Sequence, residues 1–273
     1  MATFNGTDFS DIINARGTND ILNGNGGSDI LNGNGGNDTI NGGSGDDILN
    51  ADNGNDSLIG GLGDDILNAD NGNNTLNGGN GDDILNAGSG NDRLIGGNGD
   101  DILNAGSGND RLIGGDGDDI LNGDSGSDVL SGDSGNDILN GDSGNDILNG
   151  DSGNDTLAGG TGTDVLTGGL GNDVFDFNSV SDSPTGFLRD VITDFVGNGS
   201  LPGDRIDLST IDANLTKGGN QAFTFIGTGA FSAPGQIRYS GGILQGSTDG
   251  DLSAEFEIAL TGTPGLVAND IIL

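Results

Sequence analysis

The 273-residue chain contains no cysteine, no histidine and no tryptophan. Without cysteine there is neither a disulfide nor a thiol nucleophile, which is compatible with an extracellular protein that is stabilised in some other way. Without histidine, neither an H-E-x-x-H zinc helix nor a Ser-His-Asp triad can form. Carboxylates are abundant, but they form a uniform series, whereas a glycosidase pair needs two unlike environments. We therefore expect a protein that is not an enzyme.

Positive charge is also scarce. Seven Lys and Arg residues stand against 43 acidic residues, and the formal net charge is −36. Nucleic acid is therefore not expected as a partner. The first ten residues, MATFNGTDFS, contain neither a basic nor an apolar segment, so we expect no cleaved N-terminal signal peptide. No apolar run approaches the roughly 20 residues that cross a bilayer, so no membrane span is expected.

A strict nine-residue repeat fills most of the chain. Residues 132–149 read GDSGNDILN twice, and the same period runs over residues 6–176 as 19 repeats without an insertion or deletion. The sixth place of each repeat is Asp except at Asn74, and the eighth place is always apolar. Self-similarity at a fixed period indicates an architecture in which each repeat stacks on others.

The acidic residues favour ordered turns over a disordered acidic tail. Residues 1–176 contain 32 acidic residues and three Arg, a net charge of −29, and all 32 acids are Asp. A solvated acidic segment would accept Glu as readily. A short carboxylate beside Gly and Asn is instead typical of turns in which the side chain folds back towards its own backbone. A chain with so little hydrophobicity and so much charge is not expected to fold unaided.

The repeat predicts a solenoid of two parallel sheets. Gly at the first and fourth places is expected to supply turn conformations closed to residues with a Cβ atom. The last three residues of each repeat form a short strand whose eighth-place side chain points inward. Two repeats then give one coil, in which eighth-place Leu packs against Leu. One Leu per repeat cannot offset the ordering entropy of nine residues, so a further source of stability is needed.

Stacked aspartates predict that this source is calcium. Repeats two apart lie on the same edge of such a coil, so Asp119 stacks near Asp137 and Asp128 near Asp146. Without a counter-ion these carboxylates repel one another. Ca²⁺ binds about six to eight oxygen ligands and mixes carboxylates with backbone carbonyls, which Gly-rich turns offer. We therefore expect multiple Ca²⁺ ions as the cofactor on which folding depends.

The repeats resemble the nonapeptide repeats of RTX, or hemolysin-type, calcium-binding proteins, as in residues 96–104, GGNGDDILN. The resemblance implies an all-β fold, a right-handed parallel β-roll followed by a small β-rich C-terminal domain. It implies that each Ca²⁺ lies between successive turns, held by the sixth-place Asp of two stacked turns and by carbonyls of the Gly-rich residues before them. The metal ligands predicted in this way are Asp29, Asp38, Asp47, Asp56, Asp65, Asp83, Asp92, Asp101, Asp110, Asp119, Asp128, Asp137, Asp146, Asp155, Asp164 and Asp173.

Three positions depart from the family's pattern. Phe9 and Thr18 occupy the fourth place of the first two repeats. Residues 1–23 are therefore expected to form a cap without ions, ahead of a calcium-binding β-roll over residues 24–176. Asn74 keeps an oxygen but lacks the charge, at the sites that it would share with Asp56 and Asp92.

Residues 177–273 predict a C-terminal β domain. Segments of alternating apolar residues, typical of strands, lie at 191–195, 205–208, 223–226, 237–239 and 256–260. The phrases DVITDF, GDRIDLSTIDAN and FTFIGTGAFS are similar to the C-terminal domain of serralysin-type metalloproteases, whose protease domain is absent here. That resemblance implies export through a type I (ABC transporter) system and an extracellular location. The final residues 270–273, DIIL, fit the family's uncleaved C-terminal signal, although an edge strand would look the same.

Residues around Gly250 have two interpretations. Ser247, Asp249, Asp251 and Glu255 are spaced as in a calcium loop with oxygen ligands. A polar hairpin turn accounts for the same residues.

An outward-facing Ile column also has two interpretations. The seventh place points outward and is Ile in eight successive odd-numbered repeats, beside an Asn column at the ninth place: Ile12, Ile30, Ile48, Ile66, Ile84, Ile102, Ile120 and Ile138. A contiguous apolar stripe indicates a contact surface for a second copy or an ordered surface. Ile is also a good strand former, which explains the column without a partner.

These features predict a secreted calcium-binding repeat protein. Its β-roll folds on binding several Ca²⁺ ions outside the cell and has a structural or surface-interaction role. The alternative is a non-catalytic calcium-binding and secretion module of an exported enzyme such as a metalloprotease.

Overall fold

The computed structural model describes residues 1–197 and 203–273. The fold is all-β, with 46% of the residues in strands. Among the described residues the helices are two short 3-10 turns, η1 (Gly186–Leu188) and η2 (Ala268–Asp270). No described helix is long and apolar enough to cross a membrane. The chain divides into two compact units, Met1–Ile138 and Leu139–Leu273.

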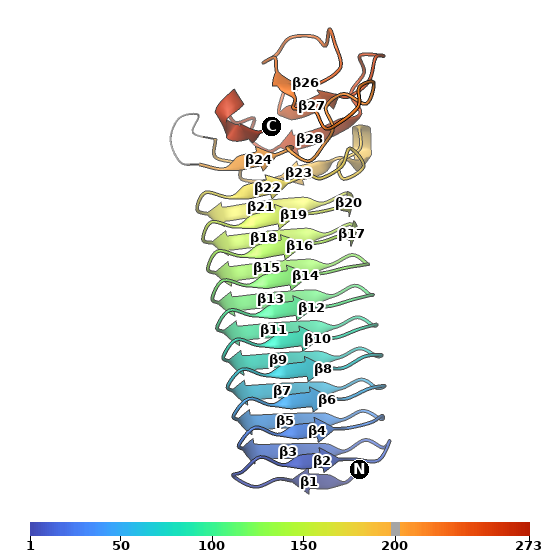
Figure 1. Cartoon of the computed structure of the whole chain (residues 1–273), viewed down its shortest axis with the longest axis vertical. Coiled ribbons are helices and arrows are strands. Elements are labelled where there is room, and N and C mark those ends of the chain that lie inside the picture. Colours follow the sequence, from blue (N-terminus) through green and yellow to red (C-terminus); the bar gives the residue numbers. More distant parts are fainter. Residues whose placement is uncertain (198–202) are drawn as a thin grey trace. The chain divides into compact units, whose positions relative to one another are not determined.

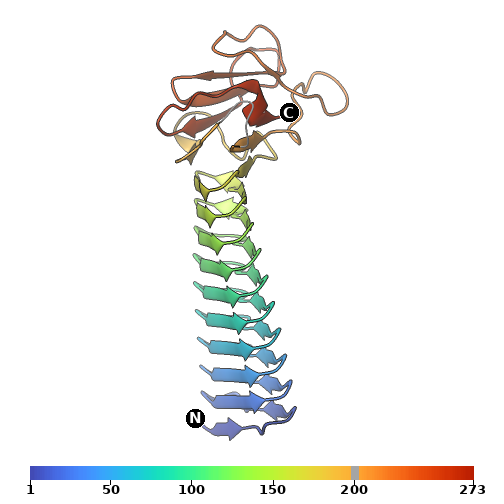
Figure 2. The same ribbon diagram turned by 90° about the vertical axis from the view of Figure 1, so that its left-hand side faces the viewer.

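The first unit is a parallel solenoid, as the repeat predicts. Even-numbered repeats build one sheet, whose strands in order are β1 (Thr3–Asn5), β3 (Ile21–Gly26), β5 (Thr39–Ser44), β7 (Ser57–Leu62), β9 (Thr75–Asn80), β11 (Arg93–Asn98), β13 (Arg111–Asp116) and β15 (Val129–Ser134). Odd-numbered repeats build the other sheet, of β2 (Ile12–Asn14), β4 (Ile30–Asn32), β6 (Ile48–Asn50), β8 (Ile66–Asn68), β10 (Ile84–Asn86), β12 (Ile102–Asn104) and β14 (Ile120–Asn122). Figures 1 and 2 show the strands of each sheet stacked one above the next.

In both sheets, each residue pairs with the residue two repeats further along the chain. In one sheet Ile84 pairs with Ile102 and Leu85 with Leu103, all in parallel. In the other sheet Leu94 pairs with Leu112. Like residues therefore stack on like residues, and every eighth-place side chain points inward. The eighth-place Leu residues from Leu22 onward are fully buried, which confirms the predicted core.

The glycines act differently from the prediction at one place of the repeat. Fourth-place glycines do adopt positive φ, as at Gly99 (φ 123°). Second-place residues do so as well, including Asn25 (φ 77°) and Asp52 (φ 65°), because Asn and Asp tolerate this region. First-place glycines such as Gly96 are needed for space instead, since a Cβ there would collide with the carboxylate of Asp101.

The second unit contains the last repeats and the C-terminal strands; β16 (Ile138–Asn140) spans the boundary between the units. One sheet has the order β18 (Ile147–Ser152), β21 (Val165–Leu170), β23 (Asp190–Ile192), β28 (Phe256–Leu260), β27 (Ile243–Ser247), β26 (Gln236–Ser240) and β25 (Thr224–Phe225). The other has β19 (Thr156–Ala158), β22 (Val174–Asp176), β24 (Arg205–Asp207) and β29 (Ile271–Ile272). A third, short sheet pairs β17 (Ser143–Gly144) with β20 (Thr161–Gly162).

Each predicted C-terminal segment overlaps a strand. One further strand, β27, was not predicted and pairs antiparallel with both β26 and β28. The edge strand given as the alternative for the final residues is present as β29, in which Ile271 and Ile272 pair with Ile206 and Asp207 of β24. The apolar end of the chain is therefore an edge strand in the folded protein.

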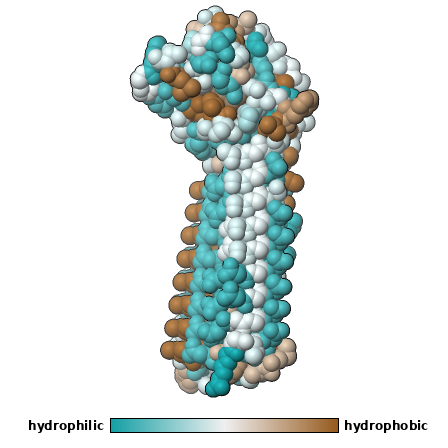
Figure 3. Space-filling view, turned by 90° about the vertical axis from the view of Figure 1, so that its right-hand side faces the viewer, coloured by the Kyte–Doolittle hydropathy of each residue, from teal (hydrophilic) through white to brown (hydrophobic). Residues whose placement is uncertain are grey.

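The predicted Ile column lies on the outer face of the odd-repeat sheet. Ile30, Ile48, Ile66 and Ile84 are each 36–37% exposed, while Ile102 is half-buried. Figure 3 shows a brown column of apolar side chains along one side of the repeats. Beside it the ninth-place Asn side chains form a ladder of amide hydrogen bonds at 2.8–2.9 Å. The outward seventh and ninth places of this sheet in the first unit therefore carry no charge.

Candidate metal sites

All sixteen predicted Asp ligands are buried at the turns between the sheets. The carboxylate of each turn accepts a hydrogen bond from a backbone amide of the preceding coil. The Asp47 amide donates to Oδ1 of Asp65 at 2.7 Å, and the Asp65 amide donates to Oδ1 of Asp83 at 2.7 Å. On the other edge the Asp92 amide donates to Oδ1 of Asp110 at 2.6 Å. One carboxylate oxygen is thus used to fix the side chain in place.

At twelve of these positions the second oxygen, Oδ2, has no such partner. It is buried and without a hydrogen-bond partner among the described residues at Asp29, Asp38, Asp47, Asp56, Asp65, Asp83, Asp92, Asp101, Asp110, Asp119, Asp164 and Asp173. A buried carboxylate oxygen without a partner is costly, because it has lost water and gained nothing in return. Because these oxygens recur at the same place of successive repeats, one kind of ligand could satisfy all of them.

Carbonyl oxygens lie beside the unpartnered carboxylates. A Cβ placed on Gly60 would collide with Oδ2 of Asp65 and would lie 2.7 Å from the carbonyl oxygen of Gly78. The same position beside Gly42 is flanked by Oδ2 of Asp47 and the carbonyl oxygen of Gly60. At both of these places the first-place glycine therefore leaves room beside a carboxylate oxygen and a carbonyl oxygen two repeats on. Carboxylate and carbonyl oxygens are the ligands that Ca²⁺ prefers, so the residues present fit this ion.

The acidity of these groups shows how poorly their charge is compensated by the protein alone. Burial first, and neighbouring carboxylates second, raise the pKa of Asp65, Asp101 and Asp119 to about 7. Burial likewise raises the pKa of Asp56 and Asp92 to about 6. Hydrogen bonds from backbone amides act in the opposite direction but are outweighed. A divalent cation would favour the charged form at every one of these positions.

Asn74 keeps the ladder but changes its chemistry. The Asp56 amide donates to Oδ1 of Asn74 at 2.9 Å, and the Asn74 amide donates to Oδ1 of Asp92. Its Nδ2, where the other repeats have Oδ2, donates to the carbonyl oxygen of Gly72 at 3.0 Å. The Asn74 side chain therefore donates a hydrogen bond to a carbonyl oxygen, where the Asp of other repeats has a second carboxylate oxygen.

The first two repeats satisfy their carboxylates with hydroxyl groups. Oδ2 of Asp11 accepts hydrogen bonds from the amide (2.6 Å) and hydroxyl (2.9 Å) of Thr7. Both carboxylate oxygens of Asp20 accept from the hydroxyl of Thr18 at 3.0 Å, and Oδ1 also accepts from the amide of Ala2. These contacts engage carboxylate oxygens of the kind that the later repeats leave without a partner.

The ladder continues past the repeat, which the sequence analysis missed. The Asp164 amide donates to Oδ1 of Asp190 at 2.7 Å, and the Asp173 amide donates to Oδ1 of Asp204 at 3.1 Å. Oδ2 of Asp190 is buried without a described partner, and burial raises the pKa of Asp190 to about 8. Oδ2 of Asp204 instead accepts from the amide of Val196. The signal was available: each Asp stands two residues before a buried Ile, as in the repeats, but the spacing of nine is lost.

The two edges differ on their outer side. On the odd-repeat edge the fifth place is an exposed Asp in five successive repeats, Asp46, Asp64, Asp82, Asp100 and Asp118. Each of the last four donates its amide to the Oδ1 of the previous one at 2.9–3.2 Å. On the even-repeat edge an Asn ladder occupies the same place, as where the Asn73 amide donates to Oδ1 of Asn55 at 2.8 Å. Negative charge is therefore concentrated on one edge.

Comparison with known proteins identifies the repeat. The sequence pattern of the family described as "RTX calcium-binding nonapeptide repeat (4 copies)" matches more than half of the chain, in overlapping segments at residues 5–40, 23–58, 41–76, 59–94, 77–112, 95–130, 113–148, 122–157 and 149–183. No curated protein matches the chain. Among solved structures, a subunit of the mannuronan C5-epimerase from Azotobacter vinelandii is similar, with 32% identity over 57% of this chain and 77% of that chain. The TM-score is 0.28, too low for this likeness to support a conclusion.

Proposed function

Because the chain belongs to the RTX calcium-binding nonapeptide repeat family, we propose that it is a secreted protein whose β-roll folds on binding several Ca²⁺ ions outside the cell. The role that follows is structural or one of surface contact, without catalysis. The folded β-roll carries the function, and calcium controls whether the roll folds.

The observation that carries this proposal is the column of buried Oδ2 atoms that have no partner. Carbonyl oxygens from two repeats on lie close to the same place in several repeats, as with Asp65 and Gly78. Calcium would supply the missing positive charge. The sixteen Asp residues predicted from the repeat, joined by Asp190, would hold the ions together with the Gly-rich carbonyls. With a net charge of −36, the chain without cations is driven apart by its own repulsion.

Folding and metal binding are then one equilibrium. The ligands of one ion come from two repeats that touch only in the folded coil, so the unfolded chain lacks a site to compete. An ion that binds the folded state alone stabilises it by mass action. Low calcium inside the cell would keep the chain unfolded for transport, and higher calcium outside would fold it.

We also propose export through a type I (ABC transporter) system that reads residues 270–273, in line with the serralysin-like phrases of the C-terminal region. In the folded chain Asp270 and Ile271 are buried, and the Leu208 amide donates to the carbonyl oxygen of Ile272 at 2.9 Å. A transporter could read these residues only before they pair. The calcium-dependent fold supports this order of events, because it delays pairing until the chain is outside.

The partner of the folded roll is proposed to meet the Ile column. An uncharged sheet face with a contiguous apolar column is unusual on a chain that is otherwise strongly acidic. On this view a second copy or an ordered surface contacts Ile66, Ile84 and their stacked neighbours, once calcium has neutralised the edges. The alternative is that the chain is a non-catalytic calcium-binding and secretion module of an exported enzyme. A catalytic domain in the same polypeptide would favour this alternative.

The test of the calcium proposal is a titration followed by circular dichroism, with matched variants. Asp101 is a buried sixth-place residue and Asp100 its exposed neighbour. We expect Asp101→Asn to weaken calcium-induced folding about tenfold or more, since it removes a charged ligand, and Asp100→Asn to act much less. A β-rich spectrum that strong chelator leaves unchanged, or equal effects of the two variants, would overturn the proposal.

A further inference from the structure

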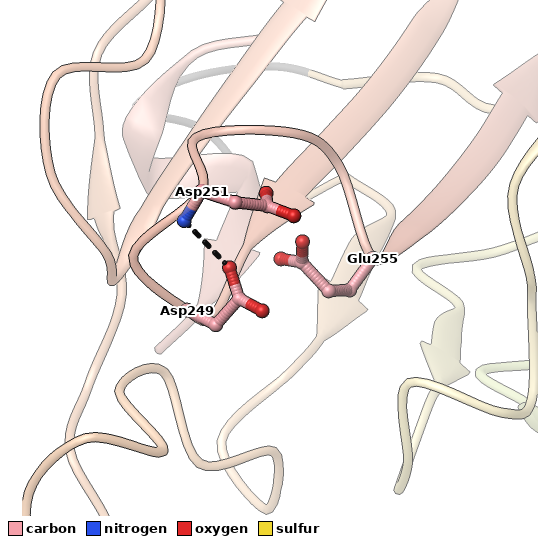
Figure 4. Close-up of side chains that lie close together, drawn as sticks. All are labelled: Asp249, Asp251 and Glu255. Atoms are coloured by element: carbon pink, nitrogen blue, oxygen red, sulfur yellow. Dashed lines mark hydrogen bonds between the residues drawn. The ribbon is translucent and has the colours of Figure 1, made fainter.

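Three carboxylates converge outside the repeats, in the loop between β27 and β28. One oxygen atom each of Asp249, Asp251 and Glu255 lies within 4.8 Å of the others. Figure 4 shows the three side chains pointing towards a common centre from the two sides of the loop. Three negative charges at such separations repel one another unless a cation lies among them.

The loop backbone holds the carboxylates in this arrangement. The Asp251 amide donates to Oδ1 of Asp249 at 2.9 Å, and the Ser253 amide donates to Oδ1 of Asp251 at 2.8 Å. The Thr248 amide donates to Oε2 of Glu255. Each carboxylate thus has one oxygen engaged by the backbone, and the converging set is oriented before any ligand arrives.

Among the residues that the structure describes, no ion pair joins a cationic side chain to this cluster. The ion pairs found among the described residues join Arg189 to Glu257 at 2.6 Å and the N-terminus to Asp20. Glu257 lies two residues after Glu255, within β28, and its charge is balanced by the ion pair with Arg189. The three carboxylates of the loop have no equivalent partner in the described part of the chain.

A buried hydroxyl without a partner points to a ligand at the same place. Ser247 is fully buried, and its Oγ has no hydrogen-bond partner among the described residues. The β27–β28 register pairs Leu244 with Ile258 and Gly246 with Phe256, and the Glu255 amide donates to the carbonyl oxygen of Gly246 at 2.9 Å. Ser247 is the last residue of β27 and Glu255 directly precedes β28, so the unused hydroxyl lies at the base of the loop that carries the carboxylates.

We propose that Ser247, Asp249, Asp251 and Glu255 bind one Ca²⁺ ion, separate from those of the repeats. Three carboxylates and a hydroxyl form an all-oxygen ligand set, which suits a hard divalent cation. Loop ligands with unequal spacing favour Ca²⁺ over Mg²⁺, since Mg²⁺ demands near-octahedral geometry. The bound ion would fix the β27–β28 connection and satisfy the hydroxyl that the protein leaves unpaired.

Native mass spectrometry of the full chain at saturating Ca²⁺ tests the proposal by counting ions. The double variant Asp249→Asn, Asp251→Asn should hold one ion fewer than the parent. Asp212→Asn is the matched control: Asp212 also accepts backbone amides, from Asn214 and Gln221, but belongs to no carboxylate cluster. An unchanged ion count in the double variant overturns the proposal, and a loss in the control as well shows that the count reports on folding alone.

Substitutions at Ser247 keep the test decisive if the double variant fails to fold. With an ion in place, Ser247→Asp adds a charged ligand and should raise the calcium affinity of this site, while Ser247→Ala should lower it severalfold with the net charge unchanged. Without an ion, Ser247→Asp buries an unpaired carboxylate near three others and should destabilise the chain even at saturating Ca²⁺. That result, or equal stabilisation of the parent by Mg²⁺ and Ca²⁺ at this site, would contradict a calcium site.

Discussion

Replacing Asn74 by Asp should change stability in opposite directions with and without calcium. Asn74 is the one sixth-place residue of the repeats without a charge, and Nδ2 donates to the carbonyl oxygen of Gly72 at 3.0 Å. Asn74→Asp replaces that donor by an acceptor. In excess chelator the variant loses the hydrogen bond and gains a buried oxygen without a partner, which costs about 1–3 kcal/mol. We therefore expect it to be less stable than the parent by that amount.

With calcium the sign should reverse. The new carboxylate would complete the ladder between Asp56 and Asp92 and release the Gly72 carbonyl, which improves two ion sites at once. An ion present at 100 times its dissociation constant contributes about 2.7 kcal/mol of stability. Two such sites, less the cost found in chelator, leave a gain of about 2–4 kcal/mol.

Circular dichroism measures both values, through folding driven by the osmolyte trimethylamine N-oxide in chelator and through urea unfolding at saturating Ca²⁺. Asn73→Asp is the control, because it makes the same chemical change at the adjacent, exposed fifth place. The control should shift stability by only a few tenths of a kcal/mol in either condition. The reasoning would be refuted if Asn74→Asp shifted stability in the same direction with and without calcium, or behaved like Asn73→Asp.

Three further predictions concern pH, the Ile column and the C-terminus. Burial raises the pKa of Asp65 to about 7, so in chelator the folded state binds protons more tightly than the unfolded chain. The stability of the folded state in chelator should therefore fall as pH rises from about 4 to about 7. A β-content that instead increases over this pH range in chelator would contradict the raised pKa of these buried carboxylates. Replacing Ile66, Ile84 and Ile102 together by Thr should leave calcium affinity unchanged but weaken self-association or adsorption, measured by sedimentation and surface binding at saturating Ca²⁺; parental behaviour would leave the column as a row of good strand formers. Deleting residues 270–273 should abolish export in a type I secretion assay while the repeats still fold with calcium, and normal secretion would mean that these residues serve only as a strand.

Much of the fold followed from the sequence because the repeat is decided locally. Alternation of outward and inward residues over three positions is enough to bury Leu85 and Leu103, and a strict period of nine stacks them two repeats apart. The same period places Asp83 next to Asp101 without knowledge of any distant segment. The need for a cation followed as well, since stacked carboxylates repel wherever the period puts them.

Other features depended on contacts between segments that the period does not relate. Asp190 joins the ladder 26 residues after Asp164, and Asp204 follows Asp173 after 31 residues, so only the parallel pairing of the strands themselves reveals them. The separate use of the glycines is also a tertiary matter. Gly96 needs space beside a carboxylate, whereas Gly99 needs its positive φ.

The loop between β27 and β28 makes the same distinction at a single site. The sequence by itself determined that Ser247, Asp249, Asp251 and Glu255 are oxygen-bearing residues spaced around Gly250, and it left a metal loop and a polar hairpin equally open. The tertiary structure decided that the three carboxylates converge and that the Glu255 amide bonds to the Gly246 carbonyl oxygen, next to the buried Ser247. The physical reason is that an antiparallel register is set by packing and hydrogen bonds along the whole strand pair, and no short spacing encodes it.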